Sequence, residues 1–465
     1  MVVCPMSGID VRDVAAHDLR MSTFLRFSPA AFRKPHRGRR AGTLAAVLAG
    51  VVACVAQVHA ENLDQAFAAA LAADRRLAAS NHQVSAAEAG ANAAHAAAMP
   101  NLSADSAYLR LDREPAAVVN LAPLPRTELP FAQDEALAYR IGVSVPLYTG
   151  GRIASGARAA DETLAAARTE TTRTEQDVKL NVAEAYTNVL RAQRLLELAD
   201  SGVQTLEAHE RDVANLFQQG LVAKTDLLAV RVALANARQD RIRADNAVDL
   251  SRAAYNRLLG RALDAPVALD DVAPLAAPGP LEAVSARALT GRAELAGLEH
   301  QRSALEEQSS AVRGGGLPQL VFTAGYAHLD NRYLAREGGW SAMLGLHWDL
   351  FDGGLIRSQA GAIAAKAQAV DALREDARSQ IALQVRAAWL AVGESASRVE
   401  VAQATVEQAD ENLRVARDRY QSGVGTNTEV LDAETLRVKS RSNWFNAIYD
   451  NVFAGLRLKR AAGEL

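Results

Sequence analysis

The chain has 465 residues and a formal charge of −3 at pH 7, and its aromatic residues make up only 5% of the sequence. Abundant Ala, Leu, Val, Arg and Glu with so few aromatics favour long helices over a β-sandwich. The length is sufficient for two or three ordinary domains.

The first 60 residues are interpreted as an N-terminal extension and a secretory signal peptide. A basic stretch, FRKPHRGRR at 32–40, precedes an apolar run that ends at Ala60 in a small-x-small cleavage pattern. The apolar run also reaches about the minimum length of a transmembrane helix, which is the alternative interpretation. Cys54 follows a loose match to a lipoprotein cleavage box, so acylation of this cysteine is a further alternative.

Removal of this segment changes the charge and the cysteine content of the chain. The remainder has 43 basic and 51 acidic residues and a formal charge of −8, which argues against nucleic acid as a partner. Both cysteines, Cys4 and Cys54, lie in the removed segment, so an exported protein would have no disulfide. Its stability would then come from packing or assembly.

The two halves of the chain predict the same elements in the same order. Each half predicts a helix, a strand, a loop, a second strand, a long helix, a turn and a final helix. The loop at 114–135 is Pro-rich, and the corresponding loop near 330–339 is shorter. The predicted helices are 61–98, 152–216 and 226–259 in the first half, and 281–312, 355–419 and 427–462 in the second.

A strand–helix junction with two glycines occurs in both halves, 203 positions apart. From Gly151 to Gly220 there are 69 residues, and from Gly354 to Gly423 there are also 69. A loop would tolerate insertions over such a length, so each interval is interpreted as a rigid helix. The four junction glycines are Gly150, Gly151, Gly353 and Gly354.

This duplication defines the predicted domain organisation. Residues 261–280 are Pro-rich and without pattern, which is typical of a connector. The predicted parts are the extension and signal peptide at 1–60, a first repeat at 61–260, the connector at 261–280 and a second repeat at 281–465.

Four segments alternate apolar with small or polar residues, which predicts β-strands. They lie at 101–112, 137–147, 319–329 and 342–350, and each has about the ten residues that a tilted strand needs to cross a bilayer. A soluble amphipathic sheet is the alternative, but the export signal favours a membrane barrel. Four strands cannot close a barrel, and an open edge in lipid leaves backbone groups unpaired. Sister chains must therefore complete it, and three chains would give twelve strands.

The long segment 152–216 contains no proline and would extend on the order of 100 Å as one helix. Val178, Val182, Tyr186 and Val189 form an apolar stripe at helical spacing, which predicts packing against helices of the same or neighbouring chains.

Helical turns are predicted at Gly220 and Gly423, where glycine can close a helix in the left-handed conformation. The residues from Thr426 to Glu429 fit a capping box that opens the next helix. Both patterns indicate helical hairpins.

The two turns, FQQGLVAKTDLL and YQSGVGTNTEVLDAE, resemble those of the TolC-like outer-membrane efflux and secretion channels, as do the Gly-Gly junctions and the opening Glu61-Asn62-Leu63. The resemblance covers residues 61–463. It implies a mainly α-helical, internally duplicated chain whose long helical hairpins form a periplasmic tunnel. The four strands would contribute to a trimeric, twelve-stranded β-barrel in the outer membrane.

The same resemblance implies partners and a function. The protein would be a homotrimer in the lipid of the outer membrane, reaching into the periplasm. It would dock on a periplasmic adapter (a membrane fusion protein) and an inner-membrane transporter that supplies the energy. It would act as the passive channel of a tripartite efflux pump or a type I secretion system. Its cargo (drug, metal or polypeptide) would be set by the transporter and adapter.

By position, the resemblance also implies an acidic gate at the periplasmic end. Glu429 and Asp432 lie three residues apart on one helical face and would bring six carboxylates to the axis of a trimer, favouring cations. The implied interhelical links are Thr225, Asp226 and Tyr420.

Structural roles are the alternative for these acidic residues. Glu429 is placed to cap its helix and Asp226 to complement a helix N-terminus, whereas Asp432 lies one turn further in. Gly425 stands where the best-known member of the family has an arginine, which removes an obvious partner of Asp226.

The sequence has no pattern of catalytic or cofactor-binding residues. The nine histidines are scattered without metal-ligand spacing, and there is no phosphate-binding Gly-Lys-Ser/Thr loop and no Gly-x-Ser-x-Gly motif. The glycines at 314–316 precede Leu317-Pro318 and are interpreted as the end of a helix. We therefore expect no enzymatic activity, no metal and no cofactor. The alternative to an export channel is a soluble periplasmic coiled-coil scaffold or adapter.

Overall fold

The computed structural model describes residues 60–120, 122–123, 125–273 and 279–465. The predicted signal peptide and Cys54 lie outside these residues. In chain order the elements are α1 (Leu63–Ala73), α2 (Arg75–Ala96), β1 (Asn101–Arg110), β2 (Ala116–Val119), β3 (Thr127–Pro130), β4 (Glu135–Tyr148), α3 (Arg152–Gln218), α4 (Lys224–Leu258), α5 (Leu281–Gly291), α6 (Ala293–Gly314), β5 (Gln319–Leu329), β6 (Gly338–His347), α7 (Leu355–Gln421) and α8 (Asn427–Ala462).

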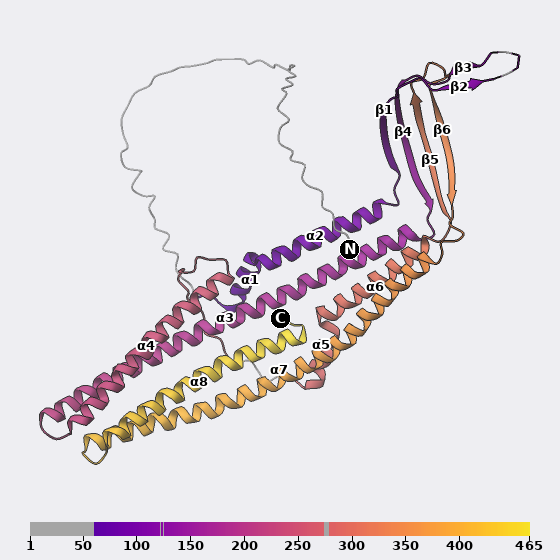
Figure 1. Ribbon diagram of the computed structural model, residues 1–465. Helices are drawn as coiled ribbons and strands as arrows, with labels where there is room; N and C mark the ends of the chain where they lie inside the picture. The colour runs from indigo at the N-terminus through magenta and orange to yellow at the C-terminus, as the bar shows by residue number, and fades with distance from the viewer. Residues whose placement is uncertain (1–59, 121, 124, 274–278) are drawn as a thin grey trace, which may run out of the picture. The chain divides into compact units, whose positions relative to one another are not determined.

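Two long helical hairpins make up most of this structure. The helices α3 and α7 each have 67 residues, and they pair with α4 and α8, of 35 and 36 residues. Figure 1 shows each long helix running from the sheet to a turn at its far end, with its partner helix returning beside it. The predicted helices at 152–216 and 355–419 are confirmed to within two residues at their ends.

The first helix of each half is shorter than predicted, because the chain breaks it once. At Asp74 the backbone is extended, and the carboxylate accepts hydrogen bonds from the N–H groups of Arg76 (2.7 Å) and Leu77 (3.1 Å), which caps α2. Arg292 makes the same break between α5 and α6. The predictions of single helices at 61–98 and 281–312 are therefore wrong.

The four long strands form one antiparallel sheet in the order β1-β4-β5-β6. The two halves of the chain meet in its centre, where β4 pairs with β5 and Gly142 lies opposite Gly325. A Cβ on Gly325 would lie 2.5 Å from the carbonyl oxygen of Ile141, so this close approach requires glycine. Within the described residues, β1 and β6 are the two edges of the sheet.

One face of this sheet carries the apolar residues that the alternation predicts, and most of them stay exposed in the single chain, while Phe322 and Tyr326 are half-buried. Trp340 is 84% exposed and Leu344 61% exposed, so the chain itself covers neither. Trp348 follows β6 and is 52% exposed. Paired positions across the four strands on this face are Leu102, Leu137, Ile141, Phe322, Tyr326, Trp340 and Leu344.

The Pro-rich stretch at 114–135 is not only a loop. It contains a two-stranded antiparallel hairpin in which β2 pairs with β3, from Ala116 opposite Pro130 to Val119 opposite Thr127. The prediction of a surface loop did not include this hairpin. Pro130 stands at the end of its strand, where a residue without an N–H is tolerated.

The cluster of buried side chains around Tyr186 ties the beginning of the described chain to the long helices. The Tyr186 hydroxyl lies 2.7 Å from the backbone carbonyl oxygens of both Glu61 and Asp270. The Glu61 carboxylate in turn accepts hydrogen bonds from Arg261 (2.8 and 2.9 Å) and from the Tyr255 hydroxyl (2.9 Å). This arrangement fixes the chain before α1 and the start of the connector against α3.

No helix in the described ranges combines the length and the apolar character that crossing a membrane requires.

Candidate functional site

The turns at the ends of the two hairpins have the same local structure. Gly220 (φ 76°) and Gly423 (φ 73°) are both left-handed. In the first turn the N–H of Leu221 donates to the carbonyl of Leu216, and in the second the N–H of Val424 donates to the carbonyl of Arg419. These are Schellman motifs, which satisfy the last carbonyls of α3 and α7. The prediction of glycine-closed hairpins is confirmed.

Apolar side chains from all four helices pack together next to these turns, and we call this region the tip. Val213 and Val230 of the first hairpin and Val430 of the second are at most 1% exposed. The complete buried set is Val213, Leu227, Val230, Leu413, Ala416, Tyr420, Val430 and Ala433. The tip is therefore a small core shared by both hairpins.

A chain of polar contacts crosses this core and joins three helices. His209 Nε2 of α3 lies 2.8 Å from Oδ1 of Asn427, the first residue of α8. The Asn427 side chain donates from Nδ2 to the backbone carbonyl of Asp226 in α4, at 3.2 Å. Because Nδ2 is the donor, Oδ1 is the acceptor, so the neutral His209 ring carries its proton on Nε2. His209 and Asn427 are 5% and 4% exposed.

The surroundings of His209 favour its neutral form. Burial lowers the pKa of His209 below 6.5, the hydrogen bond with Asn427 opposes this shift, and the charge of Arg417 adds to it. Asp212 and Glu434 raise the pKa to a smaller extent. Glu434 is itself only 4% exposed and is bound by Arg437 through two hydrogen bonds of 2.7 and 3.0 Å.

Tyr420 lies in the same core and packs edge-to-face on the His209 ring, with the ring centroids 5.3 Å apart. Burial, followed by the negative charges of Asp226 and Asp212, raises its pKa. Its buried hydroxyl finds no hydrogen-bond partner among the residues that the structure describes. Of the three predicted link residues, the structure brings Tyr420 and Asp226 near each other. The third, Thr225, is exposed.

The two proposed gate acids lie beside one another at the start of α8. Thr426 caps this helix by accepting the N–H of Glu429 at 3.3 Å, as the capping box predicts. The Glu429 carboxylate lies 3.7 Å from the Arg419 guanidinium of α7 instead of accepting the N–H of Thr426. Only one of the two hydrogen bonds of a capping box is therefore present. Asp432 follows one turn later and is exposed.

Sequence reasoning missed His209 and Asn427. Val203, Leu206, His209 and Val213 follow each other at helical spacing, and all four are buried. That periodicity was a local signal that His209 belongs to the core stripe of α3. Its partner could not be found in this way, because Asn427 lies 218 residues away in the sequence.

At the opposite end of the long helices, the junction glycines all have positive φ, as their repetition indicates. Gly151 and Gly354 are the N-caps of α3 and α7, with φ of 82° and 86°. Gly150 is also confined by packing, because a Cβ there would lie 2.5 Å from the carbonyl oxygen of Gly314. Gly353 is left-handed as well, with φ of 68°. The prediction that 314–316 ends a helix is confirmed, since α6 ends at Gly314.

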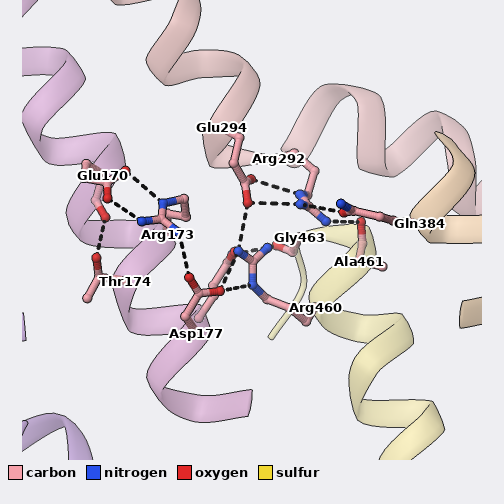
Figure 2. A network of polar contacts seen from close by, with 11 residues as sticks. Glu170, Arg173, Thr174, Asp177, Arg292, Glu294, Gln384, Arg460, Ala461 and Gly463 are labelled. Atoms are coloured by element: carbon pink, nitrogen blue, oxygen red, sulfur yellow. Dashed lines mark hydrogen bonds and ion pairs between the residues drawn. The ribbon is translucent and has the colours of Figure 1, made fainter. Parts of the chain in front are cut away.

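In the half of α3 nearer the sheet, a network of charged side chains links the two halves of the chain (Figure 2). Arg460 of α8 donates to Asp177 of α3 at 2.9 Å and to Glu294 of α6 at 2.8 Å. Arg292 donates to Glu294 (2.9 and 3.0 Å) and to the carbonyl of Ala461. Arg173, Glu170 and Gln384 extend the network.

The charges of this network balance, with three arginines and three carboxylates. Burial alone would raise the pKa of Glu294, but its hydrogen bonds with Arg292 and Arg460 lower that pKa to about 2. Glu294 is therefore ionised at every physiological pH. Because each charge has a partner, we interpret the network as a structural clamp rather than a binding site.

Among the residues with described positions, no group of three or more His, Cys, Asp or Glu side chains is arranged to hold a metal ion. The polar side chains of the tip and of the charged network bind one another or backbone carbonyls.

Comparison with known sequences identifies relatives of this chain. The family model described as outer membrane efflux protein matches residues 67–261 and 284–464. The alkaline protease secretion protein AprF of Pseudomonas aeruginosa is 27% identical over 308 residues, which cover 62% of each chain. The outer membrane protein TolC of Escherichia coli is 26% identical over 310 residues, 63% of this chain and 62% of TolC. The aligned part therefore spans a little over three fifths of these relatives.

A solved structure shares the fold over a larger part of the chain. The outer membrane protein VceC of Vibrio cholerae has a TM-score of 0.74 and 17% sequence identity, and the match covers 86% of this chain and 96% of VceC. At this identity the likeness concerns the fold, which is mainly helical with a few strands.

Proposed function

Because the chain belongs to the outer membrane efflux protein family, we propose that it is the outer-membrane channel of a tripartite efflux pump or a type I secretion system. It resides in the outer membrane, as its relatives do. The observation that carries the proposal is the family match on both halves of the chain, at residues 67–261 and 284–464. The names of the relatives include both efflux and protease secretion, so the proposal includes both an efflux pump and a secretion system.

The exposed apolar face of the sheet supports a barrel made by several chains. A four-stranded sheet with free edges at β1 and β6 would leave backbone groups unpaired in lipid, at several kcal/mol each. Three copies joined edge to edge would give twelve strands and remove every edge. We therefore propose a homotrimer whose apolar face contacts outer-membrane lipid and whose helices form the periplasmic tunnel.

Matching elements in the two halves support an internal duplication, with repeats at 61–260 and 281–465 and a connector between them. The helices α1 and α5 both have 11 residues, and α2 and α6 both have 22. Tyr186 and Trp389, 203 positions apart, play matching parts: Tyr186 contacts the carbonyl of Asp270, and Trp389 Nε1 donates to the carbonyl of Gly279 at 2.9 Å. Tyr186 contacts the middle of the connector, and Trp389 contacts its end.

The tip is the proposed gate of the channel. Glu429 and Asp432 would form the acidic ring of the trimer, and Thr225, Asp226 and Tyr420 would contribute links between helices. The glycine turns at Gly220 and Gly423 fix the hairpin ends, and the junction glycines fix the passage from strand to helix. The partners we propose are a periplasmic adapter and an inner-membrane transporter, with no nucleic acid, cofactor or catalysis involved.

Conductance of the purified protein in planar lipid bilayers tests this function. We expect discrete single-channel steps that multivalent cations block from the side of the tip. Replacing both Glu429→Ala and Asp432→Ala removes the proposed ring, so the block should weaken by about tenfold or more, while the channels still form. A matched control is the exposed acid pair Glu400→Ala and Glu407→Ala, which should leave the block unchanged.

Two results would count against these proposals. Protein that gives no conductance would contradict the channel and favour the soluble scaffold or adapter. Channels whose cation block is unchanged in the Glu429→Ala, Asp432→Ala variant would contradict the acidic ring alone.

A further inference from the structure

The contacts of His209 give the tip a property that the acidic ring does not explain. One buried imidazole connects α3 to the first residue of α8, and that residue holds the first turn of α4. The two hairpins are thus joined at their ends by an imidazole, the side chain type whose ordinary pKa lies within the physiological pH range. Every other hydrogen bond in this chain of contacts is made by an amide, whose charge does not depend on pH.

We propose that His209 and Asn427 form a pH-dependent lock on the tip, which holds the two hairpins together while His209 is neutral and releases them when His209 is protonated. His209 is a positioning residue in this role, since it acts on the gate through Asn427. The lock rests on the proposed function only in that the tip is taken as the entrance of the channel.

The physical basis is the burial of the ring. The neutral ring needs one acceptor for Nε2–H, and Asn427 Oδ1 supplies it at 2.8 Å. Protonation leaves that donor in place but adds a charge at Nδ1, in a side chain that is 5% exposed. A charge in such a place is unfavourable without a partner, so the protonated ring favours a conformation in which it meets water.

The charges around His209 do not cancel this effect. Asp212 lies on the same helix as the ring, Arg417 and Tyr420 contribute from α7, and Glu434 with Arg437 from α8. From α4, Asp226 enters this chain of contacts through its backbone carbonyl. Arg437 already neutralises Glu434, and Arg417 repels a second positive charge. Asp212 is the carboxylate left to favour the protonated ring, and burial outweighs it.

The sign follows from this balance. In the closed tip the pKa of His209 lies below its ordinary 6.5, and in an open, hydrated tip it returns to about that value. The open tip therefore binds protons more readily than the closed one, and the closed tip loses stability as the pH falls below about 6.5. Acidification should release the lock.

Hydrogen–deuterium exchange of the intact protein in detergent tests the lock without any measurement of a pore. Between pH 7.5 and 5.5, after correction for the intrinsic exchange rates, we expect protection of residues 205–232 and 413–436 to fall by up to about tenfold. This is the largest change that one group with an open-state pKa near 6.5 can produce over that interval. In His209→Gln, which keeps an N–H donor but cannot titrate, the change should disappear.

A control variant and a second measurement make the test decisive. His82→Gln, an exposed histidine on α2, should keep the wild-type response. An NMR titration of the His209 ring in the unsubstituted protein should give a pKa below 6.5, even if His209→Gln does not fold. A pKa of 6.5 or above, or the same pH response in folded His209→Gln, would overturn the lock. Protein that forms no pore but shows the response would contradict only the proposed channel.

Discussion

Tyr186 shows how much of the structure depends on one hydroxyl group. Its ring is fully buried, and its oxygen lies 2.7 Å from two backbone carbonyls that are far apart in the sequence. The Glu61 carbonyl keeps a second hydrogen bond from the N–H of Asp270, but among the described residues no other donor reaches the Asp270 carbonyl. The hydroxyl therefore holds the middle of the connector, at Asp270, against α3.

Removal of this hydroxyl should destabilise the protein without changing its fold. Tyr186→Phe leaves the Asp270 carbonyl without its donor and the buried ring without its hydrogen bonds, which we expect to lower the free energy of unfolding by about 1–3 kcal/mol. Urea denaturation of the detergent-solubilised protein measures this change. Tyr148→Phe, at an exposed tyrosine, is the matched control and should have no effect. Equal stabilities of the two variants would contradict the assigned role of Tyr186.

At the scale of elements, the charged network fixes where the two halves of the chain are held together. It joins α3, α6 and α8 at Asp177, in the half of α3 nearer the sheet, and so leaves the segments toward the tip free of this constraint. We therefore expect any movement of the tip to occur in the parts of the hairpins between the clamp and the turns.

Glu294 is the centre of this clamp, and its stabilising effect should depend on pH in a defined direction. Its pKa is lowered from 4.5 to about 2, so its contribution is complete above pH 4.5 and is lost as the pH falls toward 2. Glu294→Gln should lower the stability at pH 7 by on the order of 3 kcal/mol and weaken the loss of stability between pH 4.5 and 2. Thermal unfolding at several pH values measures both effects.

An exposed acid provides the comparison. Glu400→Gln, on the outside of α7, should follow the wild-type profile across the same pH range. If Glu294→Gln were as stable as this control at pH 7, the clamp would contribute nothing to the fold.

Local sequence patterns predicted the long helices and strands well, because each pattern depends only on residues that are close together in the sequence. The glycine junctions, the Schellman turns and the four strands all follow from residues within a few positions of each other. Asp74 was also a local signal, since its side chain caps α2, but the apolar pattern across it was continuous and concealed the break. The hairpin of β2 and β3 was missed because prolines on both sides of it indicated a loop.

The contacts of the candidate site could not be predicted in the same way. The contact between His209 and Asn427 joins residues from different halves of the chain, and the clamp joins residues up to 283 positions apart. Such pairs depend on how the hairpins pack, which periodicity does not specify. The resemblance indicated Tyr420 and Asp226, but the contacts of His209 with Tyr420 and Asn427 came only from the structure.

At the scale of the whole molecule, the proposed barrel assigns opposite environments to neighbouring residues of β6. Leu344 and Met343 are both 61% exposed in the single chain, but they lie on opposite faces of the sheet. Leu344 would face lipid and Met343 the wet interior. An exposed charge on the lipid side is unfavourable by about 2–4 kcal/mol near the middle of the bilayer.

Two arginine variants test this assignment. Leu344→Arg should reduce the amount of assembled protein in the outer-membrane fraction severalfold, whereas Met343→Arg should assemble at nearly the wild-type level. Semi-native gel electrophoresis of membrane fractions, which separates assembled from unfolded protein, measures both. The reverse order of the two variants would place the apolar face inside the barrel.

The central claim is that the chain forms a barrel only together with copies of itself. Native mass spectrometry of the protein extracted from outer membranes with detergent tests this most directly, because it counts the chains in one particle. The account predicts particles of three chains in the outer-membrane fraction. A single chain recovered from the soluble periplasmic fraction would contradict it.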